Sequence, residues 1–316
     1  MITTKTVLVL GAGASAPYEF PTGDALIRGI RDLAGSLDTE SWCIGFLEYM
    51  NHHVPKEALS RCDLATRMKA LSTELRQARP FSIDEFLGRR PDLADAGRLV
   101  ISICLLQAEH KSEAKLQSDG TPGHWYDYLK SKLVGSAETL GHDQLRLITF
   151  NYERSLEHFL YQSLGPYYSR ALTEDAYTAA IKQFRFLHIY GSLGPLPWQS
   201  ATGAVPYGAQ GYQEILTATK SVKVLHQGAE DAVQQNFKTA QEWLQWADRV
   251  LFLGFGFHKD NVERLKLREI HKGAKEISGT CKALDRTSKD SVQSCVTFPN
   301  SHADCYTFLH DHVVLS

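Results

Sequence analysis

A glycine-rich turn near the start of the chain carries the first chemical signal. Four of the five residues at 6–10 are aliphatic, and they run directly into the Gly-Ala-Gly-Ala-Ser segment at 11–15. A turn of this kind lets backbone N–H groups approach a diphosphate at the start of a helix. Ala16 stands where the G-x-G-x-x-G pattern has its third glycine, and the dinucleotide-binding pattern tolerates alanine there. The turn indicates nucleotide binding, although a plain strand-to-helix turn uses the same glycines.

Polar residues and glycines also follow four other apolar segments of the chain. Ligands of parallel α/β sheets bind beyond the carboxyl ends of the strands. If these segments are strands of one sheet, the residues that follow them meet at one rim and form a site. They are Asn151 after 145–150, Gly191 and Ser192 after 184–190, Gly254 and Gly256 after 249–253, and Asp285 after 280–284.

The elements that must position these residues follow from the order of the segments. Apolar, strand-like segments alternate with segments of helical pattern, which predicts a parallel sheet with helices on both faces. We expect one Rossmann-like α/β domain over residues 1–316. The region at about 24–145 is mostly helical in pattern, so we expect a large helical insertion after the first strand. Within it, Ser82 precedes Glu85 at capping-box spacing, which predicts a helix start.

Composition and charge exclude several classes of function. The chain has 316 residues and a formal net charge of −2, so we expect no strong direct binding to nucleic acid. No run reaches the roughly 18 apolar residues of a membrane-spanning helix, and no signal peptide is evident. None of the six cysteines forms a C-x-x-C pair, so we expect no metal site. These features predict a cytoplasmic protein with free thiols and no membrane association.

Taken together and in order, the motifs resemble those of the sirtuin-like superfamily. The segments at 11–15 and 20–23 resemble its first nucleotide loop, and the Thr-Phe-Asn-Tyr-Glu segment at 149–153 resembles its T-x-N-Y-D motif. Residues 190–192 stand in the place of its H-G-S, and 253–257 resemble its glycine-ended strand. The chain looks above all like the bacterial sirtuin-like proteins of anti-phage defence systems, which hydrolyse NAD. The paired cysteines of the zinc module in protein-deacetylating sirtuins are missing, which favours the hydrolase branch.

The resemblance implies an NAD+ hydrolase that releases nicotinamide and ADP-ribose and depletes NAD in anti-phage defence. NAD+ is then a substrate, and no metal is expected. The resemblance implies that Asn151 orients the nicotinamide ribose and the attacking water. The residues that it implies for binding NAD are Gly11, Ala12, Gly13, Ser15, Gly191, Ser192, Gly254, Gly256 and Asp285.

The chain departs from the family at the general base. The family has a histidine directly before Gly-Ser, whereas this chain has Tyr190 there. A tyrosine, with a pKa of about 10, is a poor base near neutral pH. His188 lies two residues earlier, and residues i and i+2 of a strand point to the same face. His188 and Tyr190 are therefore both candidate catalytic residues. The alternatives are a satisfied core histidine for His188 and a helix N-cap for Asn151.

Two other functions stay open at this point. The chain is alternatively an assembly subunit that binds NAD or ADP-ribose, with weak or partner-dependent activity, and works with a HerA-type ATPase. The missing family histidine favours this alternative, and we expect a homo-oligomer in either case. A Rossmann oxidoreductase would need an acidic residue about 20 residues after the glycines, at the end of a second strand. The chain instead enters a helical segment there.

Overall fold

The computed structural model describes residues 2–36, 41–53, 61–80, 82–118, 123–141, 144–223, 230–270, 275–282, 284–313 and 315. The chain divides into two compact units. Unit 1 comprises Met1–Phe20, Ser112–Ile189 and Gln234–Ser316, and unit 2 comprises Pro21–Lys111 and Tyr190–Val233. Among the described residues, no helix combines the length and the apolar character needed to cross a membrane.

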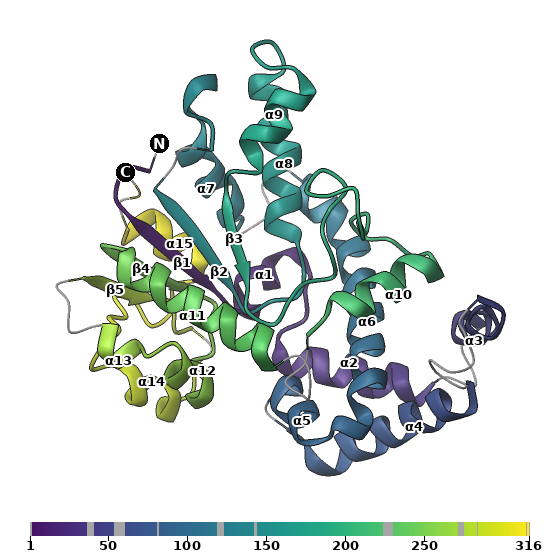
Figure 1. Ribbon diagram of the computed structural model, residues 1–316. Helices are drawn as coiled ribbons and strands as arrows, with labels where there is room; N and C mark the ends of the chain where they lie inside the picture. Colours follow the sequence, from purple (N-terminus) through teal and green to yellow (C-terminus); the bar gives the residue numbers. More distant parts are fainter. Residues whose placement is uncertain are drawn as a thin grey trace. The chain divides into compact units, whose positions relative to one another are not determined.

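Unit 1 is built on a five-stranded sheet with the order β3-β2-β1-β4-β5, in which every pair of neighbours is parallel (Figure 1). Every residue of the central strand β1 is buried, as expected of a strand covered on both faces. Leu10 at its end pairs with Thr149 and with Leu253, so three strands finish at one level. The strands are β1 (Thr6–Leu10), β2 (Leu145–Thr149), β3 (Arg185–His188), β4 (Arg249–Leu253) and β5 (Glu276–Gly279).

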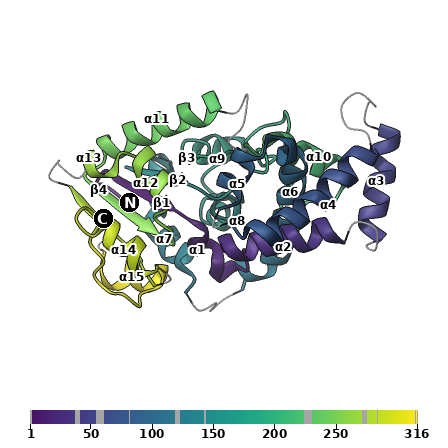
Figure 2. The same cartoon turned by 90° about the horizontal axis from the view of Figure 1, so that it is seen from below.

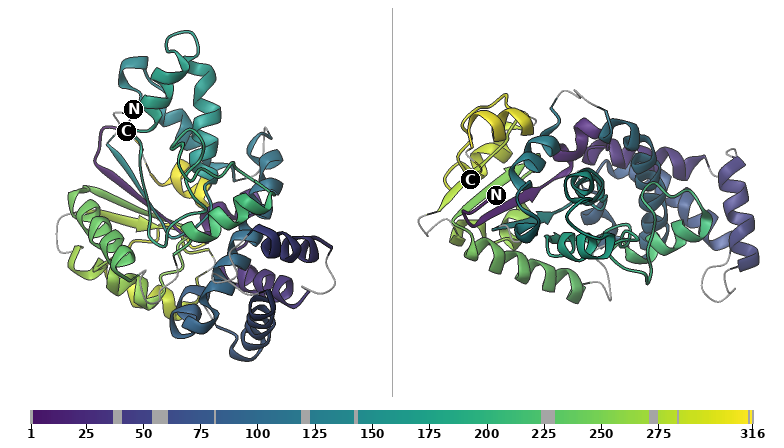
Figure 3. Two further views of the ribbon diagram at one scale, coloured as in Figure 1. Left: turned by 45° about the vertical axis from the view of Figure 1, so that its right-hand side comes forward. Right: turned by 90° about the horizontal axis from the view of Figure 1, so that it is seen from above.

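Helices flank this sheet on both sides, which confirms the predicted α/β class. Figures 2 and 3 show α11 on one side of the strands and α15 on the other. The helix α7 packs against both α8 and α15. The helices of unit 1 are α1 (Ala12–Ser15), η1 (Ala16–Tyr18), α7 (Trp125–Leu133), η3 (Ala137–Thr139), α8 (Ser155–Tyr168), α9 (Glu174–Ile181), most of α11 (Glu230–Trp246), α12 (Lys259–Arg264), α13 (Leu267–Ile270), α14 (Arg286–Val292) and α15 (Cys305–Asp311).

The described residues of unit 2 are mostly helical outside 190–211. That stretch has turns and bends but no helix, and Gly191 in it forms an isolated bridge to Val222. The helix α2 packs along α4. The Ser82 hydroxyl caps α5 by accepting a hydrogen bond from the Glu85 N–H at 3.4 Å, as the capping-box spacing predicts. The helices are α2 (Gly23–Gly35), α3 (Ser41–His53), α4 (Arg61–Ala78), α5 (Ile83–Arg89), η2 (Pro91–Leu93), most of α6 (Ala94–Leu116) and α10 (Tyr212–Ser221).

The predicted insertion corresponds only in part to unit 2. Residues 21–111 form a compact unit together with 190–233, whereas the end of the predicted insertion, from Ser112 onward, belongs to unit 1. The segment at 190–233 is rich in polar residues, glycine and proline over much of its length, so no periodic pattern linked it to the helices of the insertion.

Two predicted strands differ from those observed. The last strand was expected at 280–284, but β5 occupies Glu276–Gly279. Its single aliphatic residue, Ile277, pairs with Val250, and so short a strand carries little apolar signal. The strand expected at 184–190 ends at His188, and Tyr190 lies in a turn. The alternation rule that placed the two side chains on one face therefore does not apply to them.

Candidate active site

Glycines at the ends of β1 and β4 bring two loops into backbone contact. Gly11 N–H donates to the Leu253 carbonyl at 3.0 Å, and Gly13 N–H donates to the Gly254 carbonyl at 3.0 Å. Gly254 has a φ of +57°, and a Cβ on it would lie 2.0 Å from the Ala14 nitrogen. A Cβ on Gly11 would lie 2.6 Å from the Gly254 oxygen. Packing within the protein thus requires these glycines, and it already uses two N–H groups that a diphosphate was expected to contact.

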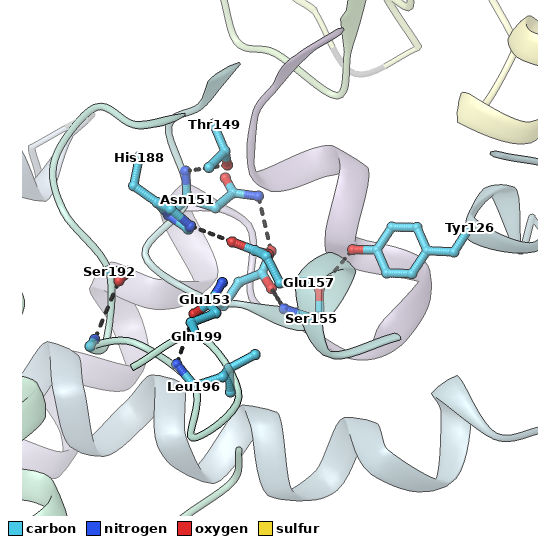
Figure 4. A network of polar contacts seen from close by, with 11 residues as sticks. Tyr126, Thr149, Asn151, Glu153, Ser155, Glu157, His188, Ser192, Leu196 and Gln199 are labelled. Carbon is cyan, nitrogen blue, oxygen red and sulfur yellow. Dashed lines mark hydrogen bonds and ion pairs between the residues drawn. The ribbon is translucent and has the colours of Figure 1, made fainter. Parts of the chain in front are cut away.

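Asn151 ties the end of β2 to the first loop. Its Nδ2 donates to the Gly11 carbonyl at 3.2 Å and to the Ser15 Oγ at 3.3 Å, across 140 and 136 residues of sequence. The same nitrogen lies 3.2 Å from Glu153 Oε1 (Figure 4). The backbone N–H of Asn151 donates to the Thr149 hydroxyl at 3.0 Å. The convergence of the first loop and Asn151, predicted from the rim of a parallel sheet, is confirmed.

The orientation of the Asn151 amide follows from these contacts. Three protein acceptors surround Nδ2, so the nitrogen is committed to the protein. Among the described residues, none donates a hydrogen bond to Oδ1, and the side chain is only partly buried. The amide oxygen is therefore the end of this side chain that is left for a ligand or water.

Asn151 does not cap the helix that follows it. The helix α8 begins at Ser155, and the residue in the N-cap position is Arg154. Glu153 satisfies the first N–H of the helix instead, because its Oε2 accepts from Ser155 N–H at 2.6 Å. The alternative role of Asn151 as a helix N-cap was wrong.

His188 lies beside this network and uses both ring nitrogens. Nδ1 is 2.8 Å from the Asn151 carbonyl oxygen, and Nε2 is 2.6 Å from Glu157 Oε1. The His188 side chain is 13% exposed and that of Glu157 is 5% exposed. Burial lowers the pKa of His188, but the charge and hydrogen bond of Glu157, the Asn151 carbonyl and the charge of Glu153 outweigh it. The pKa of His188 is therefore raised above its usual value.

Residues of α7 and α11 support the hydrogen-bond network around Asn151 and His188. The Trp125 Nε1–H donates to the Ala14 carbonyl at 2.7 Å, and Tyr126 OH lies 2.7 Å from Ser155 Oγ. The Asn236 side chain donates to the His188 and Ile189 carbonyls at 3.0 and 2.9 Å. The two loops and the end of β3 are thus fixed by side chains of other elements.

Sequence reasoning missed Glu157 and the supporting residues. Glu157 lies on α8, four residues after Glu153. Two acidic residues that follow Asn151 in the sequence could have been noted as candidates for the site. Nothing in the sequence marked Glu157 as buried, because a single acidic residue in an amphipathic segment usually faces solvent. Trp125 and Tyr126 resembled ordinary core residues.

Three predicted site residues belong to unit 2. The Tyr190 carbonyl accepts from Lys223 N–H at 3.0 Å, and Gly191 has a φ of +76° and bridges Val222. The Ser192 hydroxyl accepts from Gly194 N–H at 3.3 Å. The functional roles expected of Tyr190, Gly191 and Ser192 stay predictions.

Two further residues of unit 1 have local roles. Asp285 is the N-cap of α14: its Oδ1 accepts from Ser288 N–H at 2.9 Å and its Oδ2 from the Ser288 hydroxyl at 2.8 Å, and these bonds lower its pKa. Gly256 follows β4, and a Cβ there would lie 3.1 Å from the His258 ring. Within the described residues, neither shares a hydrogen bond with Asn151 or His188.

Ala12 is the first residue of α1, and its carbonyl accepts from the Ser15 hydroxyl at 3.3 Å. This bond holds Ser15 Oγ where Asn151 reaches it. No group of three or more His, Cys, Asp or Glu side chains is placed to hold a metal ion in the part of the chain that the structure describes.

No model of a known protein family matches the chain, and no curated protein matches it. A functional conclusion therefore depends on the chemistry of the site.

Proposed function

We propose that unit 1 binds NAD+ at the carboxyl ends of β1 and β2 and hydrolyses the bond between nicotinamide and ribose. The observation that carries this proposal is the hydrogen bonding of Asn151 to Gly11 and Ser15. It joins the two motifs on which the resemblance to sirtuin-like NAD hydrolases depends, and it leaves an amide oxygen for the reacting groups. Products are nicotinamide and ADP-ribose, and the cellular consequence that we propose is depletion of NAD during phage infection.

Hydrolysis of NAD+ needs no general acid, but it needs the ribose and the water to be positioned accurately. Nicotinamide leaves NAD+ as a neutral molecule, so no proton is needed to expel it. The transition state resembles an oxocarbenium ion, as in glycoside cleavage. Water adds to C1′ of the ribose as the bond to nicotinamide breaks, and one proton of the water passes to solvent or a base. The protein must hold the ribose and the water in line, which can supply much of the rate enhancement.

Asn151 suits this positioning role through its oxygen. An amide oxygen accepts hydrogen bonds from water or from a ribose hydroxyl. The resemblance implies that Asn151 orients both the nicotinamide ribose and the attacking water. In the structure the nitrogen is held by Gly11, Ser15 and Glu153, so we assign only Oδ1 to the substrate. A diphosphate at this loop would use groups other than the N–H groups of Gly11 and Gly13.

Turnover of NAD+ by the full chain tests the proposal. Nicotinamide and ADP-ribose are quantified for the wild type, for Asn151→Ala and for Thr73→Ala. Thr73 is exposed on α4 and serves as the surface control. We expect Asn151→Ala to lower turnover by about 100-fold or more, as for removal of a positioned polar group in an active site, and Thr73→Ala to leave it unchanged. Undiminished nicotinamide release by Asn151→Ala, with native circular dichroism, contradicts the mechanism.

One observation favours a second candidate, a binding subunit with slow or partner-dependent turnover. Both nitrogens of His188 are engaged within the protein, so this ring offers no free lone pair as a base. Calorimetric titration with NAD+ and with ADP-ribose, combined with turnover assays with and without a HerA-type ATPase, separates the candidates. Binding without turnover of the isolated chain, and turnover on adding the ATPase, supports the second.

A further inference from the structure

We propose that His188 is a doubly protonated residue that positions Asn151, and that it does not act as a general base. The protonation state is inferred from contacts alone, while its consequence for turnover rests on the proposed function. The two parts have separate tests.

The hydrogen count on the ring follows from its two partners. The Asn151 backbone carbonyl only accepts hydrogen bonds, so Nδ1 of His188, at 2.8 Å, must carry a hydrogen. Nε2 is 2.6 Å from a carboxylate oxygen of Glu157, and such short contacts are characteristic of charge-assisted bonds rather than neutral ones. If Glu157 is ionised, Nε2 carries a hydrogen as well. A ring with hydrogens on both nitrogens is an imidazolium.

The competing arrangement is a neutral ring whose Nε2 accepts a hydrogen bond from a protonated Glu157 carboxyl. The surroundings favour the ion pair. Glu153, just before α8, adds a second negative charge, and its two oxygens accept from Asn151 Nδ2 and Ser155 N–H, as expected of a carboxylate. The contact from α11 is with the neutral Asn236 amide. These charges raise the pKa of His188 against the effect of burial.

An imidazolium has no lone pair with which to take a proton from water. The ring instead provides a fixed N–H donor to the Asn151 carbonyl. Glu157 holds the ring at Nε2, and Asn236 holds the His188 backbone at the end of β3. The Asn151 backbone is thereby fixed between Thr149 and His188. The direction of the side-chain amide then follows from its bonds to the first loop.

The protonation state is measured by NMR of the full chain labelled with 15N-histidine, with His188 assigned by comparison with His188→Asn. We expect hydrogens on both ring nitrogens at pH 7.5, and loss of one of them at this pH in Glu157→Gln, which keeps a polar partner but removes its charge. An unprotonated ring nitrogen in the wild type at pH 7.5 overturns the proposal, whether or not NAD+ is hydrolysed.

The role in turnover is measured with the double variant His188→Asn/Glu157→Gln. The side-chain amide nitrogen of the substituted asparagine replaces Nδ1 as donor to the Asn151 carbonyl, and the neutral pair leaves no uncompensated charge. We expect nicotinamide release within about 10-fold of wild type, and a larger loss in His188→Ala/Glu157→Gln. Loss of a general base costs about 10²–10⁴-fold in rate, so an equally large loss in both double variants overturns the positioning role.

The dependence of turnover on pH gives an independent readout. A general base is active when deprotonated, so its loss of activity appears at acid pH. A charged positioning residue predicts the opposite, a decline of kcat as pH rises through the His188 pKa, and this decline is absent in His188→Asn/Glu157→Gln. An acid limb of kcat that the double variant removes contradicts the proposal. Absence of NAD+ turnover in the wild type contradicts the proposed function. The NMR measurement still decides the protonation state of His188 in that case.

Discussion

The two sides of the β1 end differ in how they are held together. On the β4 side, the loops at Gly11 and Gly254 touch backbone to backbone, with no room for a Cβ. On the β2 side, contacts are made by polar side chains of Asn151, His188 and Glu157. The glycines on the first side are explained by packing alone. The buried ion pair on the second side is not, since an apolar pair of similar volume is often as stable. The β2 side is therefore the better candidate for chemistry.

We expect the largest loss of stability from a side chain placed in the contact between the two loops on the β4 side. Gly254→Ala places a Cβ 2.0 Å from the Ala14 nitrogen at a residue with φ +57°. We expect the free energy of unfolding to fall by at least ~3 kcal/mol, because backbone strain and a backbone clash act together. Urea unfolding of the full chain measures it.

Gly23→Ala is the matched control for that change. A Cβ at Gly23 meets nothing within 4 Å, and the residue opens α2. We expect a change within about 1 kcal/mol, in the stabilising direction, because alanine reduces the freedom of the unfolded chain. Equal stability of Gly254→Ala and Gly23→Ala would show that the contact of the two loops is not as tight as described.

The next largest effect should come from the ion pair on the β2 side. Glu157→Ala leaves the His188 imidazolium buried without its partner, and such a loss typically costs about 3–5 kcal/mol. Part of that cost is recovered if the ring gives up its proton, so we expect about 2–3 kcal/mol near neutral pH. Glu157→Gln, which retains a hydrogen-bonding oxygen, should cost less. Thermal and urea unfolding of both variants measure the difference, and a Glu157→Ala variant as stable as wild type contradicts the ion pair.

The same pair predicts how stability depends on pH. Because the pKa of His188 is raised in the folded state, its contribution to stability is complete below the unfolded value of about 6.5. It is lost as pH rises through the folded pKa. We expect the difference in unfolding free energy between wild type and Glu157→Gln to be larger at pH 6 than at pH 9. A difference that grows with pH would have the wrong sign for this account.

The sequence predicted that the ends of β1 and β2 meet, but it did not predict the individual contacts on either side of the β1 end. The aliphatic runs of β1, β2 and β4 were recognisable, and parallel strands bring Gly11 and Asn151 to one rim whatever the loops do. The close contact at Gly254 was not predictable, because a glycine needed for a ligand and one needed for packing look alike. Glu157 was missed since burial of one helical residue depends on packing. The strand β5 was missed because Ile277 is its only aliphatic residue.

We expect the smallest loss of stability from substitution of Asp285. The sequence predicted this residue in the site, and the structure places it at the start of α14. Asp285→Ala removes the cap of α14, and Asp304→Ala removes the equivalent cap of α15. We expect small and similar losses of thermal stability, below those of Gly254→Ala and Glu157→Ala. Calorimetric titration of both with NAD+ extends the comparison: weaker binding by Asp285→Ala alone would assign Asp285 to the site after all.

In the mechanism that we propose, Asn151 is held by the first loop and positions the reacting groups of NAD+. The most direct test is single-turnover release of nicotinamide by wild type and Asn151→Ala, with NAD+ affinity measured in parallel. We expect Asn151→Ala to release nicotinamide at least about 100-fold more slowly than wild type. We expect its affinity for NAD+ to change far less, because Asn151 positions the reacting groups and contributes little to overall binding. Release of nicotinamide by Asn151→Ala at the wild-type rate would contradict it.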